Sequence, residues 1–356
     1  MISEAAYAAE SETNMAKVIT FGELMLRLQP GNNLRFVQTD SFEATFGGAE
    51  ANVAISLANY GIDSCFVTRL PSHAIGQMAV NSLRRYGVST EHITRGGDKI
   101  GIFFLEKGAS VRGSACIYDR TNSAIAQASE SDFNWDVVFS GADWFHFTGI
   151  TPALGQNLAH ICRQACEAAK KHGVTVSCDL NYRSKLWTRE QARSTMADLC
   201  RYVDVCISNE EDAKDIFGIE AQNTDIYAGK LDKEGYVSVA RQLSDRFGFK
   251  KVAFTLRESI SASDNDWSGM LFDSDTGETF FSRTYHLHIV DRVGGGDSFG
   301  GGLIYALLHN KNAQDSIEFA AAASALKHSI EGDYNMVSVA EVEKLVLGDS
   351  SGRVQR

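Results

Sequence analysis

Residues 291–302 read Asp-Arg-Val-Gly-Gly-Gly-Asp-Ser-Phe-Gly-Gly-Gly, which places six glycines within nine residues, directly before the apolar run 303–308. Glycine lowers the stability of a helix interior by up to about 1 kcal/mol relative to alanine. The second trio of glycines is therefore expected where a helix packs closely against a sheet or a ligand. The first trio can turn its N–H groups toward one point, and with the positive end of the following helix it predicts a site for a phosphate or a developing anion.

Asp297 stands where this helix is expected to begin. A lone aspartate at such a position is usually an N-cap. A carboxylate beside an anion site is electrostatically unfavourable unless it has a task, and accepting the proton of a hydroxyl that attacks a phosphoryl group is such a task. The turn is not one of the commoner nucleotide motifs, because G-x-x-x-x-G-K-[ST] is absent and the glycines lie near the C-terminus rather than after the first strand.

Outward from this turn, short β-prone runs alternate with amphipathic helical patterns. Strands are predicted at 17–21, 64–68, 143–148, 174–179, 203–208 and 251–256, and a hairpin region at 259–285. Helices are predicted at 50–60, 75–86, 153–172, 209–217 and 236–247, with three more beginning near Asp297, Ala313 and Ser338. This alternation is typical of an α/β protein whose parallel sheet is covered on both faces, and in such folds ligands gather at the carboxyl ends of the strands.

Two stretches, 27–46 and 99–126, are polar, β-prone and without helical period. They are expected to form a small accessory sheet or lid over the site, the alternative being long surface loops. Residues 1–14 have neither the basic start nor the apolar centre of a signal peptide and are expected to be a disordered tail, with one main domain over 15–350. No apolar run approaches the roughly 18–20 residues that a membrane helix needs.

The composition favours small-molecule chemistry. The 356 residues include 34 Lys+Arg and 45 Asp+Glu, a formal charge of −11, and 44% are hydrophobic, which rules out a disordered chain. The acidic balance argues against nucleic-acid or membrane partners. Seven cysteines without a C-x-x-C pair fit a reducing cytoplasm, and Cys162 and Cys166, one helical turn apart, are expected to be ordinary helix residues rather than metal ligands.

Residues 291–299 resemble the signature D-T-x-G-A-G-D-x-F of the ribokinase-like carbohydrate kinases, the phosphofructokinase B family. A second signature of that family, Gly47-Gly48 followed by Asn52, precedes a predicted helix that ends at Gly61. The resemblance covers about residues 17–347. It implies a ribokinase-like three-layer α/β/α fold with a central, mostly parallel sheet and a small β lid, and it implies ATP and Mg²⁺ at the site. A monovalent cation near Asp291 is left open.

The resemblance also implies roles for particular residues. Asp297 would be the catalytic base, the amides of Gly294, Gly295 and Gly296 would hold the anion, and Gly47, Gly48 and Asn52 would line the sugar pocket. Asn209 to Asp212 stands where the family carries N-x-x-E, so Asp212 either organises the metal or is an acid in the first turn of a helix capped by Asn209. Thr255, Arg257 and Glu258 replace the usual K-x-G of the nucleotide site, and Arg292 and Gly295 stand where Thr and Ala are usual.

Three segments, 22–28, 118–124 and 179–187, are similar to kinases of 2-keto-3-deoxygluconate within this family. An acid sugar needs cationic, preferably bidentate recognition, and Arg120 and Arg183 stand at positions that face the substrate in those kinases. Tyr118 belongs to the same lid segment, and Phe104 stands where a tyrosine often contacts the substrate. The reaction implied is transfer of phosphate from ATP to the C6 hydroxyl of 2-keto-3-deoxygluconate.

Several alternatives remain open at this point. The same chemistry could act on 2-keto-3-deoxygalactonate, fructose, ribose or a nucleoside. From other classes, the chain could be a catalytically silent sugar-acid sensor or a nicotinamide oxidoreductase, although an intact Asp297 and the position of the glycine turn speak against these. Polar lid strands with open edges predict at least a homodimer formed through the lid.

Overall fold

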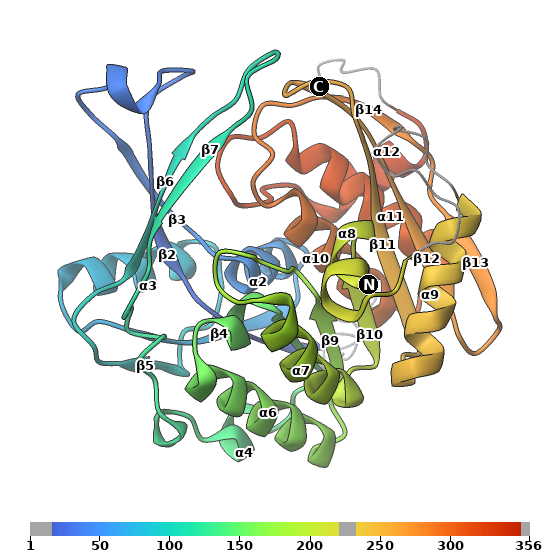
Figure 1. Ribbon diagram of the computed structural model, residues 1–356, viewed down its shortest axis with the longest axis horizontal. Coiled ribbons are helices and arrows are strands. Elements are labelled where there is room, and N and C mark those ends of the chain that lie inside the picture. The colour runs from blue at the N-terminus through green and yellow to red at the C-terminus, as the bar shows by residue number, and fades with distance from the viewer. Residues whose placement is uncertain (1–15, 221–232, 350–356) are drawn as a thin grey trace, which may run out of the picture.

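The fold is a large sheet with helices on both faces and a second, smaller sheet above one end (Figure 1). A computed structural model describes residues 16–220 and 233–349. The predicted tail 1–14 and most of the 219–236 insertion lie outside the described residues. Across the described ranges, no helix is both long enough and apolar enough to cross a membrane.

The main sheet has a parallel part and an antiparallel edge. Its strand order is β13-β12-β11-β10-β9-β8-β1-β4-β5, with β14 paired to β12. The parallel strands are β1 (Lys17–Phe21), β4 (Asp63–Leu70), β5 (Ile93–Arg95), β8 (Trp144–Thr148), β9 (Thr175–Asp179), β10 (Val205–Ser208) and β11 (Lys251–Ser259). The antiparallel strands are β12 (Asp264–Asp273), β13 (Glu278–Phe281) and β14 (Tyr285–His288).

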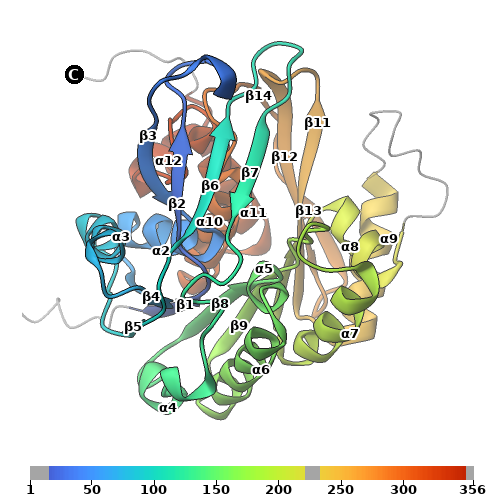
Figure 2. The same cartoon turned by 60° about the vertical axis from the view of Figure 1, so that its left-hand side comes forward.

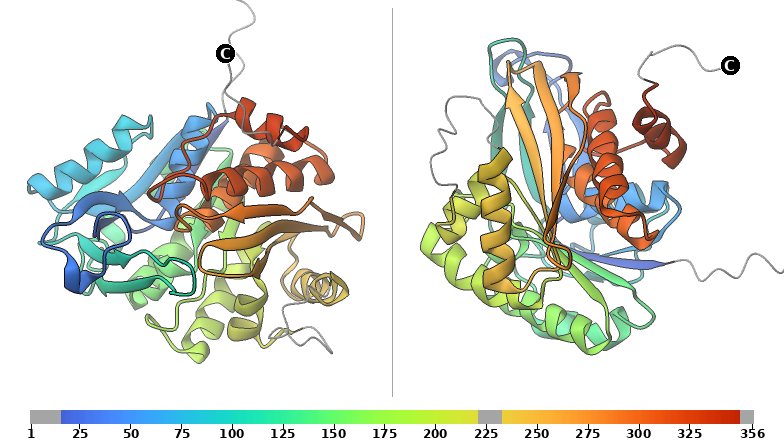
Figure 3. Two further views of the ribbon diagram at one scale, coloured as in Figure 1. Left: turned by 90° about the horizontal axis from the view of Figure 1, so that it is seen from above. Right: turned by 90° about the vertical axis from the view of Figure 1, so that its right-hand side faces the viewer.

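Helices cover both faces of this sheet. One face carries α4 (Trp135–Val138), α6 (Gln156–Lys171), α7 (Arg189–Leu199), α8 (Glu210–Phe217) and α9 (Lys233–Phe247), and the other carries α2 (Ala49–Asn59), α10 (Gly295–Leu308), α11 (Ala313–Lys327) and α12 (Val339–Val346). The short α5 (Ile150–Ala153) precedes α6, and α3 (Ala74–Arg85) packs beside α2. The right-hand view of Figure 3 shows the sheet edge-on between the two layers.

Alternating side chains along the buried strands supply the two cores. In β10, Cys206 packs on the α6–α9 side, whereas Val205 and Ile207 pack on the α10 side. In β1, Ile19 faces the first core and Val18 the second. β10 and β1 thus present apolar side chains to both faces, as expected for a parallel sheet between two helical layers. The predicted three-layer α/β/α fold class is confirmed.

The glycines at 300–302 pack against protein. A Cβ on Gly301 would lie 2.8 Å from Ser56 Cβ in α2, and one on Gly302 would lie 3.1 Å from Ala320 Cα in α11. A side chain at either position would force these helices apart. The expectation was close packing against a sheet or a ligand; only Gly300 faces the sheet, where a Cβ would lie 3.4 Å from Ile207 Cδ1, and the other two glycines pack against helices.

The two β-prone stretches pair with each other in the second sheet. Its order is β3-β2-β6-β7, with β2 at Met25–Gln29, β3 at Glu43–Gly47, β6 at Gly101–Glu106 and β7 at Ala115–Asp119. β2 pairs parallel to β6, although 71 residues separate the two strands along the chain. Figure 2 shows this sheet standing above the main sheet, beside the carboxyl ends of its strands. We call it the lid.

Several element boundaries differ from those predicted. The predicted helix 153–172 corresponds to α6, which begins at Gln156 after Gly155, while Ala153 ends the separate short helix α5. β10 begins at Val205 rather than at residue 203. α10 begins at Gly295 with Gly294 as its N-cap, so Asp297 is the third residue of the helix. The ordinary N-cap explanation for Asp297 is therefore wrong.

Candidate active site

A cavity of about 560 Å³ lies between the lid and the carboxyl ends of the main-sheet strands. The first residues of α2 and α10 also line the cavity. Ligand sites in other α/β folds likewise lie at the carboxyl ends of the strands, where the following helices begin. Most of the predicted site residues line this one cavity, namely Gly47, Gly48, Asn52, Tyr118, Arg120, Arg183, Asn209, Asp212, Thr255, Arg257, Gly294, Gly295, Gly296 and Asp297. Phe104 and Glu258 do not.

Strand parity explains these two exceptions. Successive side chains of a strand point to opposite faces. In β6, Phe103 and Leu105 line the cavity, whereas Phe104 lies on the outer face, with its ring centroid 5.8 Å from that of Phe42. In the same way Glu258 follows Arg257 in β11 and points away. The structure thus places Phe103, not Phe104, at the substrate side of the lid.

The three glycines of the anion-binding turn each have their own reason to be glycine. Gly294 adopts a left-handed conformation, with φ of 81°, and a Cβ there would lie 2.0 Å from the main-chain oxygen of Asp333. A Cβ on Gly295 would lie 2.6 Å from the His328 ring, whereas one on Gly296 would meet nothing within 4 Å. The first two glycines therefore allow close packing, and Gly296 presents its backbone to open space at the helix start, where N–H groups lack helical partners.

Asp297 lies at this helix start and is oriented by α2. Its Oδ2 accepts a hydrogen bond of 2.6 Å from Nδ2 of Asn52. Burial raises the pKa of Asp297 to about 6, while the hydrogen bond from Asn52 opposes the rise. A carboxylate held beside an anion site, with a pKa near the operating range, has the properties of a general base.

The two arginines predicted for the substrate differ in their present partners. Arg120 is ion-paired to the buried carboxylate of Glu23, with Nε to Oε2 at 2.8 Å and a second contact through Nη2. Arg183 donates from Nη1 to its neighbour Tyr182 O at 2.9 Å. Across residues 16–220 and 233–349, Arg183 makes no ion pair with a carboxylate. Arg183 therefore has donors available for an acidic ligand.

A second pair of cations lies beside the glycine turn. Arg257 and Arg292 both line the cavity, and Arg292 donates from Nη2 to Ala262 O at 2.9 Å. Burial and, next, the charge of Arg257 lower the pKa of Arg292. Two guanidinium groups that repel each other at the start of α10 would be relieved by a bound polyphosphate.

The structure shows the capping explanation for Asn209, and a role of Asp212 in organising a metal stays a prediction. Asn209 caps α8, because its Oδ1 accepts from the N–H groups of Glu211 and Asp212 at 2.9 Å. Asp212 is buried, and its Oδ1 accepts from Tyr182 N at 3.1 Å. Burial raises the pKa of Asp212 to about 7, and the charge of Arg183 opposes this rise. Asp212 thus joins α8 to the segment that carries Arg183.

The described residues contain a possible metal-ligand cluster away from the cavity. In the part of the chain that the structure describes, the one group of three close His, Cys, Asp or Glu ligand atoms is Cys65, Glu91 and His92, at the β4–β5 edge. Asp212 is not in such a group, so a Mg²⁺ ion here would need phosphate and water ligands, which is its usual habit. Cys162 and Cys166 are buried core residues of α6, as predicted.

Some residues of the cavity were not anticipated. Glu50 is fully buried, and its Oε1 accepts from Thr148 N, Thr148 Oγ1 and Thr151 Oγ1 at 3.0, 2.8 and 2.7 Å. Burial raises the pKa of Glu50 to about 7. Glu50 and Glu23 were both missed because a single acidic residue in a sequence is normally expected to be exposed to solvent. The available signals were the place of Glu50 inside the Gly47–Asn52 signature and that of Glu23 inside the segment 22–28.

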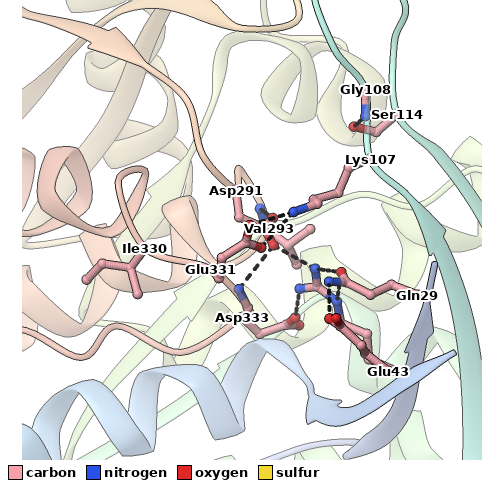
Figure 4. A network of polar contacts seen from close by, with 12 residues as sticks. Gln29, Glu43, Lys107, Gly108, Ser114, Asp291, Val293, Ile330, Glu331 and Asp333 are labelled. Carbon is pink, nitrogen blue, oxygen red and sulfur yellow. Dashed lines mark hydrogen bonds and ion pairs between the residues drawn. The ribbon is translucent and has the colours of Figure 1, made fainter. Parts of the chain in front are cut away.

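A buried ion-pair network holds the glycine turn to the lid (Figure 4). Arg27 of β2 donates from Nη2 to Asp291 Oδ2 at 2.6 Å and from Nη1 to Asp333 Oδ1. Asp291 also accepts from Gly332 N and Val293 N, each at 3.1 Å. The first residue of the signature therefore fixes the turn rather than contacting a ligand.

An anion-binding turn, a carboxylate at the helix start and, among the described residues, cations without carboxylate partners share one cavity, and these are the parts that transfer of a phosphoryl group to a hydroxyl requires. Comparison with known proteins agrees. Residues 15–339 match the pfkB family carbohydrate kinases. The chain is similar to the solved 2-dehydro-3-deoxygluconokinase of Thermotoga maritima, with 51% identity, a TM-score of 0.90, and coverage of 94% of this chain and 99% of that one.

Two curated relatives extend this picture. The 2-dehydro-3-deoxygalactonokinase of Haloferax volcanii is 30% identical over 95% of this chain and 98% of its own. The 2-dehydro-3-deoxygluconokinase of Thermoproteus tenax is 28% identical over 93% of this chain and 94% of its own. The protein belongs to the pfkB family of carbohydrate kinases.

The pH dependence of turnover tests the assignment of Asp297 as the base. Because burial raises its pKa to about 6 and only the ionised form accepts a proton, kcat/KM should rise as pH increases through about 6 and then level off. Asn52→Leu removes a hydrogen bond that lowers this pKa, so the acid limb should move to higher pH. The exposed Asn81→Leu is the control. An acid limb near the ordinary carboxyl value of about 4 would contradict the assignment.

Proposed function

We propose that this protein transfers the γ-phosphoryl group of ATP to the C6 hydroxyl of 2-keto-3-deoxygluconate, which is also called 2-dehydro-3-deoxygluconate. The product would be 2-keto-3-deoxy-6-phosphogluconate. The observation that carries the proposal is that one cavity holds Asp297 together with Arg183, a cation without a carboxylate partner among the described residues. The 51% identity to the Thermotoga maritima kinase supports the same substrate.

The residues divide the reaction between them. Asp297, oriented by Asn52, accepts the proton of the attacking hydroxyl. The N–H groups at the start of α10 stabilise the negative charge that develops on the transferred group. Arg183 and Arg120 hold the sugar carboxylate, and Arg257 and Arg292 hold phosphate oxygens. MgATP would supply the phosphoryl group and its metal would neutralise phosphate charge, and Asp212 is the cavity carboxylate that we propose helps to hold that metal.

The open side of the turn fits a phosphate. Gly296 borders open space, whereas Gly294 and Gly295 are packed against the loop beyond α11. An anion can therefore approach the backbone at Gly296, where the helix start favours negative charge. This fit does not depend on which sugar is bound.

A second substrate is supported by a specific finding. The Haloferax volcanii relative is named a 2-dehydro-3-deoxygalactonokinase, and it covers nearly the whole chain. The two sugar acids are epimers that share the carboxylate, so Arg120 and Arg183 would serve either one. The hydroxyl groups that distinguish them must be read by other cavity residues.

The first experiment is ADP formation from MgATP with 2-keto-3-deoxygluconate, 2-keto-3-deoxygalactonate, fructose, ribose and adenosine. We expect the highest kcat/KM with 2-keto-3-deoxygluconate. Asp297→Asn should lower kcat by about 10²–10⁴-fold, because the base is lost. The matched control is Asp315→Asn, since Asp315 is the third residue of α11, outside the cavity. Preference for a neutral sugar would overturn the substrate, and full activity of Asp297→Asn would overturn the mechanism.

Arg183→Ala tests recognition of the carboxylate. Loss of a cation that binds an acidic group typically costs about 2–5 kcal/mol when the contact is desolvated, so KM for the sugar acid should rise at least tenfold while KM for ATP stays within about twofold. Arg189→Ala is the control, because Arg189 pairs with Asp215 outside the cavity. An unchanged KM for the sugar acid would remove Arg183 from the substrate site.

We also propose that two copies of the chain associate through their lids. β7 is an edge strand of the lid, and Ile117 on its outer side is 56% exposed. Light scattering at micromolar concentration should give a dimer, and Ile117→Asp should give a monomer. Val137→Asp is the control, because Val137 is equally exposed, at 54%, but lies on α4. A monomeric wild-type protein would refute this proposal.

A further inference from the structure

Lys327, the last residue of α11, is a buried cation that the proposed mechanism does not use. Its relative exposure is 0%. A lysine in the last turn of a helix usually extends its ammonium to water, where it still interacts with the helix dipole. Lys327 instead points inward, and burying a charge is costly unless partners compensate it. Its position therefore calls for a specific explanation.

The ammonium contacts two main-chain oxygens from different loops. Nζ of Lys327 donates to Ile330 O at 3.1 Å and to Asp291 O at 3.4 Å. Asp291 opens the glycine signature, and Ile330 belongs to the loop after α11. A Cβ on Gly294 would lie only 3.4 Å from Cε of Lys327. The lysine thus lies directly against the anion-binding turn and joins it to the neighbouring loop.

Charged groups surround this ammonium. Burial lowers the pKa of Lys327, and the carboxylates of Asp291, Asp333 and Asp297 oppose this effect. Arg27 acts in the same direction as burial. Three carboxylates therefore share two cations beside the turn. Without Lys327 the local charge would be more negative where a phosphate must bind.

This arrangement does not fit an added monovalent cation near Asp291. The Asp291 carboxylate already accepts hydrogen bonds from Arg27 Nη2, Gly332 N and Val293 N, and its main-chain oxygen accepts from Lys327. A further cation would compete with donors that are already in place. It would also face the positive charges of both Arg27 and Lys327 at short range.

We propose that Lys327 is a built-in cation that replaces an exchangeable monovalent ion at this site. Its ammonium holds the Asp291 and Ile330 segments together and supplies fixed positive charge behind the anion-binding turn. It is a positioning residue, since it acts through the turn and does not line the cavity. Nucleotide binding and turnover should then not depend on which monovalent cation is present. The turnover part rests on the proposed kinase function, whereas the nucleotide part does not.

The first test uses the wild-type protein. Binding of MgADP, measured by titration calorimetry, and ADP formation with the sugar acid are compared in chloride salts of potassium, ammonium, sodium and choline at equal ionic strength. We expect both quantities to agree within about twofold across the four salts, because the site carries its own cation. A several-fold gain in potassium or ammonium over choline would overturn the proposal.

The second test removes the charge. Lys327→Met should weaken MgADP binding and lower turnover by about tenfold or more in choline, as the loss of a preorganised charge beside a binding anion predicts. Potassium or ammonium should partly restore both, because a small cation can enter the vacated position. Choline is too large to do so. Lys311→Met is the matched control, because Lys311 precedes α11 and pairs with the exposed Glu343.

The outcomes separate the possibilities. Nucleotide binding by Lys327→Met that equals wild type, or a loss that no cation restores in a protein with a wild-type melting curve, would overturn the proposal. If the variant does not fold, the wild-type salt series decides alone. If wild-type protein turns over none of the sugar acids, the proposed function fails, and the salt dependence of MgADP binding still tests Lys327.

Discussion

The buried guanidinium of Arg27 is the constraint on which the site depends. It bridges Asp291 and Asp333, and all three side chains are almost completely buried. Removing one partner of such a network typically destabilises a protein by about 3–5 kcal/mol, because a charge is left uncompensated. The bridge joins a lid strand, the glycine turn and the loop beyond α11. Strand β2 of the lid and the anion site are therefore joined through one buried ion-pair unit.

Once that unit is in place, the chemistry follows from position. Gly294, in a left-handed conformation, is the N-cap of α10. The N–H groups of the first turn therefore face the cavity, and Asp297 is the third residue of the helix. Asn52 reaches Asp297 because α2 and α10 pack closely, which in turn requires glycine at position 301. The packing of α2 against α10 thus brings Asn52 within hydrogen-bond distance of Asp297 and orients the base.

Local patterns in the sequence predicted most of the fold. Apolar runs bounded by polar segments located the parallel strands, and the glycine signature located the start of α10 within two residues. The cavity lining was predicted where a motif spanned it, as at 47–52 and 294–297. Phe104 was misplaced because one residue of register in a strand reverses the side chain, and the flanking Phe103 gives an identical pattern.

Pairings between distant charged residues were not predictable in the same way. Glu23 and Arg120 are separated by 97 positions, and although each lies in a segment with a recognisable motif, nothing local to either residue shows that the two pair with each other. A lysine at the end of a helix, as Lys327 is, is usually exposed, and only the packing of the folded chain around it shows that it is buried. Such contacts depend on how the helices and strands assemble in three dimensions. The periodicity of one sequence indicates which elements form but not how they assemble.

The Arg27 bridge also bears on how the molecule reaches its folded state. Arg27 and Asp333 are 306 positions apart in the chain, and Asp291 is 264 positions from Arg27. Contacts of such high sequence separation form late, because the intervening loop entropy must first be overcome. The anion turn is then ordered only when the first and last parts of the chain have met. A nascent chain that ends before residue 333 contains the lid strands and most of the sheet, but its Arg27 lacks one of the two carboxylates that compensate its charge.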